Sequence, residues 1–376
     1  MATEINGLCD DGFLPIRKAF ASNFDDNLEL GASVAVTHQG SLVVDLWAGS
    51  ADRRKTRPWQ EDTIVNVFST TKVTVILCIL KLVSEGKIDL DAPVARYWPE
   101  FGQAGKSDVT VRQTLIHRAG VPGFSEVLSF EALNDYDHLI TLIAHQKPWF
   151  DDPGTTCYHS DTFGLILGEV TRRVTGKRIS EYFHDEIAGP ATADFHIGIR
   201  ERSVRDRLAQ LVFPENAAAS IEPGSVGAKV MQNFWPPDYQ RWERQQAEFP
   251  SGNGYGNARS LAQVGAIAAM SGEVGGIRYI SEEIMELATT EQSYSECPLM
   301  GMLRLGLGFG LHSKEFPAPT PSCFHWGGFG GSSCVMDMQT GISFGYTPNR
   351  LGADRVDSDP RLGRLWQALA AVITDL

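Results

Sequence analysis

The stretch "VNVFSTTKVTVILCILKLVSEGKIDL", residues 65–90, contains the pattern Ser-x-x-Lys twice. The first copy, STTK, covers residues 69–72, and the second, SEGK, covers residues 84–87. A β-type run precedes the first copy and a nearly continuous apolar run follows it, which predicts a helix over 71–86. The two copies therefore lie at opposite ends of one predicted helix, and the surrounding residues must show which of them is a nucleophile with its base.

The first copy is suited to nucleophilic chemistry. A serine hydroxyl is a poor nucleophile until a nearby base accepts its proton, and residues three apart share a helix face, so Lys72 can lie beside Ser69. At the N-terminus of a helix, free N–H groups favour a developing anion. Lys72 is followed by the apolar run "VTVILCIL", and burial lowers the pKa of an amine toward the neutral form that a base requires. The first copy therefore predicts a nucleophile, Ser69, and a base, Lys72.

The second copy is typical of a helix end. Ser84 is followed by Gly86, a residue that commonly ends helices, and Lys87 complements the negative end of the helix dipole. We therefore interpret the second copy as structural.

Periodicity along the chain predicts strands near both ends and helices between them. The N-terminal part predicts a helix over 12–27 and two strands, 32–38 and 41–47, joined at Gln39-Gly40. Further helices are predicted over 110–118, 132–146, 161–175, 179–187, 258–271, 281–290 and 360–374, and β-type segments over 305–313, 322–331, 332–339 and 342–349. The expected fold class is α+β: an antiparallel sheet built from both chain ends and flanked by helices, with an inserted, mainly helical region. The expected domains are 1–68 together with 251–376, and 69–250, with the site between them.

Composition and charge narrow the possible functions. The 376 residues are 43% hydrophobic and 21% charged, which is typical of a folded protein, and the net charge of −13 disfavours nucleic acid as a partner. The longest apolar run, 73–80, is too short to cross a bilayer, and the first residues do not resemble a secretory signal. The histidines form no metal-binding spacing. We expect a cytoplasmic protein with no cofactor, no metal and no membrane partner, and the sequence does not indicate an oligomeric state.

Several further stretches, taken in order with "VFSTTK", identify a family resemblance. They are "RQTLIHRAGVPG" (112–123), "DDPGTTCYHSDTFGLILGEVTRRVTGK" (151–177), "GNGYGNARSLAQ" (252–263) and "FHWGGFGGSS" (324–333). Together they resemble the serine β-lactamase and penicillin-binding-protein superfamily, and within it most closely the β-lactamase-like (family VIII type) carboxylesterases. The likeness runs from about residue 30 to about residue 348. The resemblance implies a serine β-lactamase-like fold and an acyl-enzyme mechanism.

The resemblance also implies the catalytic residues. In the family the first motif supplies nucleophile and base, which match Ser69 and Lys72, and a Tyr-x-Asn motif supplies a tyrosine that shares the proton transfer. Its match is Tyr158, which follows a Pro-Gly turn and precedes a helix, whereas Tyr255-Gly256-Asn257 matches Tyr-x-Asn literally but lies in a different family segment. We therefore expect Tyr158 to be the catalytic tyrosine. The family's oxyanion hole carries over to the backbone N–H groups of Ser69 and Gly328.

The third family motif implies substrate-binding residues. It is Lys-Thr-Gly or His-x-Gly, and it matches His325-Trp326-Gly327; Trp326-Gly327-Gly328 also matches the Trp-Gly-Gly of the esterases. Two residues depart from the β-lactamases: Ser160 replaces the asparagine that holds the substrate amide, and His325 replaces the lysine that meets the lactam carboxylate. A mostly neutral imidazole is a weaker anion partner. The departures favour a neutral, small-molecule ester as substrate, in a pocket lined by Ser160, His325, Trp326 and Gly327.

Other candidate residues fit a catalytic role less well. Ser343 lies in a formal G-x-S-x-G, but no histidine follows it in the chain, so the residue order of an α/β-hydrolase triad is impossible. His117 and His159 could act as bases, although a lone histidine beside a turn is more often a structural hydrogen-bonding residue.

The expected activity is hydrolysis of short-chain carboxylic esters through an acyl-enzyme on Ser69. A β-lactamase, a D-amino peptidase or amidase, or an acyltransferase would use the same centre. A non-catalytic ligand-binding member of the family is the third possibility, and the intact Ser69, Lys72 and Tyr158 argue against it.

Overall fold

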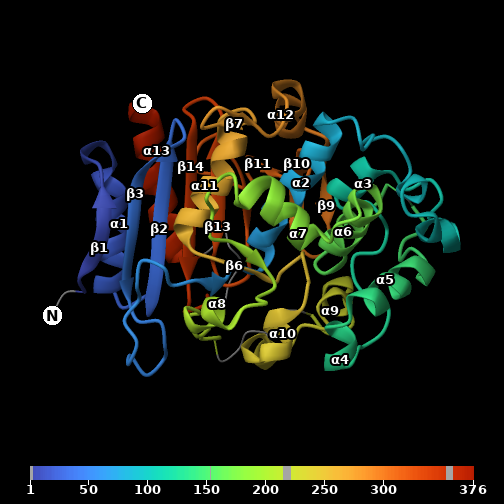
Figure 1. Cartoon of the computed structure of the whole chain (residues 1–376), viewed down its shortest axis with the longest axis horizontal. Coiled ribbons are helices and arrows are strands. Elements are labelled where there is room, and N and C mark those ends of the chain that lie inside the picture. The colour runs from blue at the N-terminus through green and yellow to red at the C-terminus, as the bar shows by residue number, and fades with distance from the viewer. Residues whose placement is uncertain (1–2, 153, 215–221, 353–358) are drawn as a thin grey trace.

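The computed structural model describes residues 3–152, 154–214, 222–352 and 359–376, and a large antiparallel sheet forms its centre (Figure 1). Among the described residues, the strand order is β1-β3-β2-β14-β13-β12-β11-β10-β9. The strands are β1 (Ile5–Cys9), β2 (Gly31–His38), β3 (Ser41–Gly49), β9 (Ser293–Cys297), β10 (Gly301–Leu305), β11 (Gly310–Leu311), β12 (Phe324–Gly327), β13 (Ser333–Asp337) and β14 (Ile342–Pro348). The predicted fold class, an antiparallel sheet with flanking helices, is confirmed.

The two ends of the chain meet in this sheet. Strand β2 pairs with β14, and Val36 lies opposite Phe344 in that pair. The predicted hairpin between β2 and β3 is present, and its turn residues Gln39 and Gly40 have φ values of 50° and 75°. Positive φ at both turn residues is the geometry that a two-residue hairpin requires, and glycine adopts it without a steric cost.

Helices cover both faces of the sheet. Helices α1 (Leu14–Asp25) and α13 (Pro360–Asp375) pack together over one face, where a buried cluster includes Phe20, Val36 and Leu369. Helix α11 (Ala258–Ala269) lies against β2, β13 and β14. Ala35 packs there on Ala258 and Ala262, because successive strand residues point to opposite faces.

The mainly helical part of the chain lies beside the sheet (Figure 1). Its central helix, α2 (Lys72–Ser84), is almost entirely buried. Its other helices in the described ranges are α3 (Val111–Leu115), α4 (Phe130–Leu133), α5 (Tyr136–His145), α6 (Thr162–Thr175), α7 (Ile179–Phe183), α8 (Arg202–Asp206), α9 (Val226–Val230) and α10 (Trp242–Gln246). Helix α12 (Glu282–Thr289), from the later part of the chain, contacts α2. One buried cluster includes Leu77 of α2, Phe163 of α6 and Trp326 of β12. Because that core joins both parts, the division into domains 1–68 with 251–376 and 69–250 stays a prediction.

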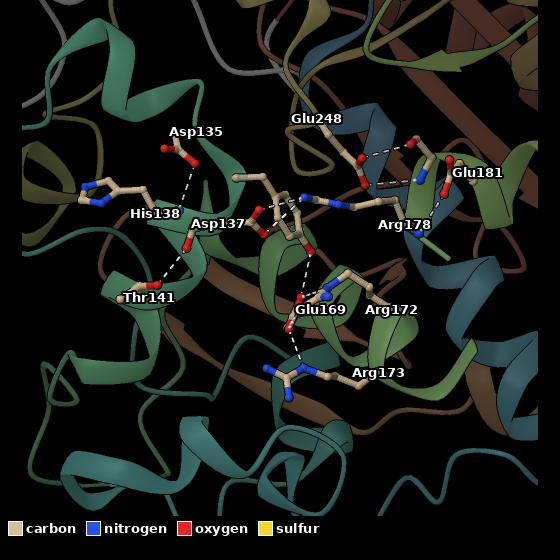
Figure 2. A network of polar contacts seen from close by, with 12 residues as sticks. Asp135, Asp137, His138, Thr141, Glu169, Arg172, Arg173, Arg178, Glu181 and Glu248 are labelled. Atoms are coloured by element: carbon tan, nitrogen blue, oxygen red, sulfur yellow. Dashed lines mark hydrogen bonds and ion pairs between the residues drawn. The ribbon is translucent and has the colours of Figure 1, made fainter. Parts of the chain in front are cut away.

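A polar network joins the outer helices, as Figure 2 shows. The buried carboxylate of Glu169 on α6 pairs with Arg172 at 2.6 Å and Arg173 at 2.7 Å, and Arg178 pairs with Asp137 of α5 at 3.2 Å. Buried carboxylates are stable only when they are paired in this way. Glu169 also accepts a hydrogen bond from the hydroxyl of Tyr136 on α5 at 3.5 Å, which ties α6, the helix that follows the 151–161 segment, to α5.

Some elements were not predicted from the sequence. Strands β1, β9 and β10 were missed, and the aperiodic stretch 213–257 contains α9, α10 and β6 (Gly254–Gly256), although its residues 215–221 lie outside the described part. No helix in the described ranges is long and apolar enough to cross a membrane. Within the same ranges, no cluster of three or more His, Cys, Asp or Glu side chains could hold a metal ion.

Candidate active site

Ser69 lies in a sharp turn between a short strand and α2. The strand is β4 (Val65–Asn66), and the turn is a 3-10 helix, η2 (Phe68–Thr71). Phe68 has a φ of 45°, which is unusual for a residue with a side chain, and its N–H donates to Asn66 Oδ1 at 2.8 Å. The N–H of Val67 donates to the carbonyl of Gly254 on β6 at 2.9 Å. These bonds fix the turn that leaves the Ser69 side chain half-buried at the start of α2.

Lys72 lies one turn further along the chain and faces Ser69. Its side chain is 1% exposed, and its Nζ lies 3.2 Å from Ser69 Oγ. The same Nζ donates to the carbonyl oxygens of Ser160 at 2.8 Å and Ser251 at 2.9 Å. The predicted proximity of the Ser69 hydroxyl and the Lys72 amine is therefore present.

The environment of Lys72 favours its neutral form. Burial lowers the pKa of Lys72 to about 7, although the nearby Asp161 carboxylate acts in the opposite direction. A neutral amine has two N–H donors, and the carbonyls of Ser160 and Ser251 can accept both. The nitrogen lone pair is then left for the Ser69 proton, as a general base requires.

The hydroxyl of Tyr158 donates a hydrogen bond to Ser69 Oγ at 2.7 Å. It lies in the segment that precedes α6, and the Nζ of Lys72 is 4.8 Å from the centre of its ring. Burial raises the pKa of Tyr158 above its usual value, and the hydrogen bond with Ser69 and the nearby Trp326 indole act in the opposite direction. The phenol therefore stays protonated at neutral pH and can serve as a hydrogen-bond donor.

The other candidates found in the sequence lie elsewhere. Tyr255 is fully buried on β6, where its hydroxyl donates to Asn253 Oδ1 at 2.6 Å. The Ser84 hydroxyl oxygen accepts the N–H of Ser281 at 2.8 Å, and Ser343 is buried on β14. The structure thus brings Tyr158, rather than Tyr255, to Ser69.

Trp326 and Ser160 are close to the three central residues. The Trp326 ring lies 5.7 Å from the Tyr158 ring, and its Nε1 atom is buried without a well-aligned hydrogen-bond acceptor in the described ranges. The Ser160 carbonyl binds Lys72, and the Ser160 hydroxyl contacts Met231 Sδ at 3.7 Å. Gly327 is the half-buried last residue of β12.

His325 is not part of this group, which contradicts the prediction that it lines the substrate pocket. Its side chain is 2% exposed and stacks on Phe316 at 4.8 Å, with Trp366 of α13 5.0 Å away. Burial lowers the pKa of His325 to about 3, so the imidazole is neutral. Because neighbours on a strand point to opposite faces, the same geometry that turns Trp326 toward Tyr158 turns His325 away.

The prediction for Gly328 also needs correction. The N–H of Gly328 donates to the carbonyl of Ser332 at 2.9 Å, so it is not free to hold an oxyanion. The position still requires glycine, because a β-carbon there would lie 2.1 Å from the carbonyl oxygen of Val67 and 3.1 Å from the nitrogen of Ser69. The close approach of β12 to the Ser69 turn depends on that missing side chain.

An aromatic group borders the Ser69 turn. Phe68, which precedes Ser69, lies 5.6 Å from the ring of Phe329, and Phe329 lies 5.0 Å from Phe234 and 6.4 Å from Phe213. Phe329, Phe234 and Phe213 are half-buried. An apolar surface of this kind is typical of small-molecule sites.

Sequence reasoning missed two contributors to the site. The carbonyl of Ser251 binds Lys72, and Asp161 raises the pKa of Lys72. No local pattern marks a backbone carbonyl, whereas Asp161 could have been noticed as an acidic residue directly after the Tyr158-His159-Ser160 motif.

Comparisons with known proteins agree with this architecture. The β-lactamase family model matches residues 20–366. LipL, an esterase/β-lactamase of Mycobacterium tuberculosis, is 32% identical over 371 residues, covering 95% of this chain and 85% of that protein. A crystal structure of a family VIII carboxylesterase has a TM-score of 0.91 at 37% identity, covering 98% of this chain and 100% of the other. A penicillin-binding-protein homologue from Caulobacter crescentus has a TM-score of 0.89 at 34% identity, with 98% and 100% coverage.

Proposed function

Because the chain belongs to the β-lactamase family and is a hydrolytic enzyme of that fold, we propose that it is a serine carboxylesterase specific for short-chain esters. The observation that carries this proposal is the Ser69 hydroxyl, which lies 3.2 Å from the Lys72 amine and 2.7 Å from the Tyr158 hydroxyl. The lowered pKa of Lys72 supports it, because a base works best when its pKa is near the working pH.

In the proposed mechanism, Ser69 Oγ attacks the ester carbonyl while Lys72 accepts the serine proton. The tetrahedral intermediate collapses, the alkoxide leaves with a proton from the Lys72–Tyr158 pair, and the acyl group remains on Ser69. Water then attacks the acyl-enzyme and gives a proton to the same pair; the acyl–Ser69 bond breaks, that proton returns to Ser69 Oγ, and the acid is released. Each step uses only groups that already contact Ser69 Oγ.

We place the oxyanion hole at the N–H of Ser69 and the N–H of Phe329. Neither N–H donates a hydrogen bond within the described part of the chain. N–H groups alternate between the two edges of a strand. The Gly328 N–H, directly after β12, points to the carbonyl of Ser332, directly before β13, so the next N–H along the chain is expected to face the other way. Two backbone donors aimed at the developing charge are what acyl transfer requires.

The preference for a neutral ester rests on the side chains around Ser69. The residue beside Tyr158 that comes from the third motif is Trp326, not a lysine, and His325 is turned away with a neutral ring. A β-lactam presents a carboxylate, and no charged partner from this motif meets it. The aromatic rings that border the Ser69 turn, Phe329 and Phe234 among them, instead offer an apolar surface for a small acyl or alcohol group.

The test compares kcat/KM on p-nitrophenyl acetate, butyrate and laurate with kcat/KM on nitrocefin. We expect acetate or butyrate to give the highest value and laurate a lower one, because a small apolar pocket gains only about 1–3 kcal/mol per methylene until the chain clashes. A higher value for nitrocefin would reverse the esterase assignment. A higher value for laurate would refute the small pocket alone.

Slow β-lactam turnover is the second candidate function. The observation that favours it is the shared nucleophile, together with the esterase/β-lactamase description of LipL. We expect nitrocefin to acylate Ser69, so that it inhibits ester hydrolysis in a time-dependent manner and is released slowly. Mass spectrometry of the intact protein after incubation would detect the covalent adduct, and its absence on Ser69→Ala would locate it.

A further inference from the structure

His117 is a buried residue with an unusual backbone conformation. It lies two residues after α3, it is 0% exposed, and its φ is 60°. Residues with a β-carbon rarely adopt such a φ, and when they do the surrounding contacts must hold them there. Such positions cluster at functional sites, so the contacts of His117 are informative.

Those contacts are made with three successive residues around the proposed catalytic tyrosine. The carbonyl of His117 accepts the N–H of Cys157 at 3.0 Å, and its Nδ1 accepts the N–H of His159 at 3.2 Å. Between them, the His117 ring lies edge-on to the Tyr158 ring, with 5.0 Å between the ring centres. His117 therefore holds the backbone on both sides of Tyr158 and also contacts its ring.

A second histidine closes the same segment. The Nδ1 of His159 hydrogen-bonds to the carbonyl of Cys157 at 2.7 Å, and its Nε2 accepts the N–H of Val121 at 3.3 Å. The imidazoles of His159 and His117 are stacked, with 5.8 Å between their centres. The segment 157–159 thus has little freedom to shift relative to the turn at His117.

The His117 ring must be neutral to accept a hydrogen bond from His159. Burial, with smaller contributions from His159 and Lys72, lowers the pKa of His117 well below its ordinary value. With Nδ1 as acceptor, the ring proton is on Nε2, which has no hydrogen-bond partner among the described residues. The His117 ring packs against the rings of Phe163 and Trp326. His117 therefore does not act as a base for Ser69, and its use is to hold Tyr158.

We propose that His117 is a positioning residue, which sets the Tyr158 hydroxyl at hydrogen-bonding distance from Ser69 by holding residues 157–159 from both sides. This inference rests on the proposed role of Tyr158 in proton transfer. A displacement of about 1 Å in a reacting group can lower a rate by about 100-fold, so loss of the His117 acceptor should reduce kcat more than it changes KM.

The experiment compares His117→Asn with His117→Gly. Both residues tolerate a positive φ and both are smaller than histidine, but only asparagine keeps an acceptor oxygen near the place of Nδ1. We expect His117→Asn to keep kcat within about threefold of the wild type and His117→Gly to lose about 10- to 100-fold, each with KM changed less than about threefold. The assay is p-nitrophenyl butyrate hydrolysis, corrected for active sites titrated with a fluorophosphonate.

Equal losses in both variants would overturn the proposal, because packing rather than the acceptor would then explain them. Full activity of His117→Gly would overturn it as well. If His117→Gly does not fold, His117→Asn decides alone: kcat within about threefold supports the proposal, and a larger loss overturns it.

Tyr158→Phe, measured on the same ester, separates this inference from the proposed function. If Tyr158→Phe is inactive and His117→Gly is active, only the positioning role is wrong. If Tyr158→Phe keeps the wild-type rate, the proposed role of Tyr158 is wrong, and the positioning role is lost with it.

Discussion

The pKa of Lys72 predicts the pH dependence of ester hydrolysis. In the proposed mechanism the neutral amine is the base, so kcat/KM should rise with pH as Lys72 loses its proton. With a pKa of about 7, the neutral fraction is about 9% at pH 6 and about 91% at pH 8, which gives an increase of about tenfold. Between pH 8 and pH 10 the expected further increase is only about 1.1-fold. An ordinary lysine, with a pKa of about 10.4, would instead give an increase of about 70-fold over that second interval.

The assay measures kcat/KM on p-nitrophenyl butyrate from about pH 5.5 to about pH 10, read at the isosbestic wavelength of p-nitrophenol and corrected for spontaneous hydrolysis. The two nearest histidines should not contribute to the rise of kcat/KM with pH. Burial lowers the pKa of His159 to about 4 and that of His117 well below its ordinary value. Neither histidine can therefore account for an ionisation near neutrality, and its assignment to the Lys72 amine needs a test of its own.

Asp161→Asn tests that assignment. The Asp161 carboxylate raises the pKa of Lys72, so its removal should move the rise of kcat/KM to lower pH. Two results would refute the reasoning. One is a kcat/KM that continues to rise tenfold per pH unit above pH 8, and the other is a rise that occurs at the same pH in Asp161→Asn as in the wild type.

Three substitutions, two of them with a matched control, test the remaining assignments by kcat/KM on p-nitrophenyl butyrate. Ser69→Ala should lower kcat/KM by about 10⁴-fold or more and abolish covalent labelling, whereas Ser84→Ala should keep the rate and the labelling. If Ser69→Ala retains a tenth of the rate, Ser69 is not the nucleophile. Tyr158→Phe should lose about 10²- to 10⁴-fold, the usual contribution of acid–base catalysis, whereas Tyr255→Phe loses only a buried hydrogen bond to Asn253 and should stay within about threefold. His325→Phe should stay within about twofold, because His325 packs between Phe316 and Trp366, and a tenfold loss would return it to the site.

Local sequence was sufficient for the features that depend on neighbours in the chain. The Ser69–Lys72 pair lies on one helical turn, so their spacing alone predicts the observed proximity. The hairpin of β2 and β3 follows from alternating residues around a turn that glycine permits. The longer helices, α2, α6, α11 and α13, each have a clear apolar pattern and lie close to their predicted positions.

The irregular stretch before β6 and the strands β1, β9 and β10 could not be predicted, because their form depends on the partners that cover them. Strand β9 pairs with β10, for instance, and Ser295 lies opposite Leu303. Strand β9 lacks the regular alternation that a solvated edge produces, and β10 alternates over only five residues.

The sequence by itself determined the helical segment that begins near Ser69, the lysine one turn later, and the apolar segments that form the sheet and its covering helices. Only the tertiary structure decided which distant groups meet that serine. Tyr158 is 89 positions from Ser69 in the chain, and the strand pairing of β12 with β13 turns Trp326 inward, His325 outward and the Gly328 N–H away. The physical reason is that a strand presents alternate side chains and alternate N–H groups to opposite sides, and which set faces the site is fixed by register with strands elsewhere in the chain.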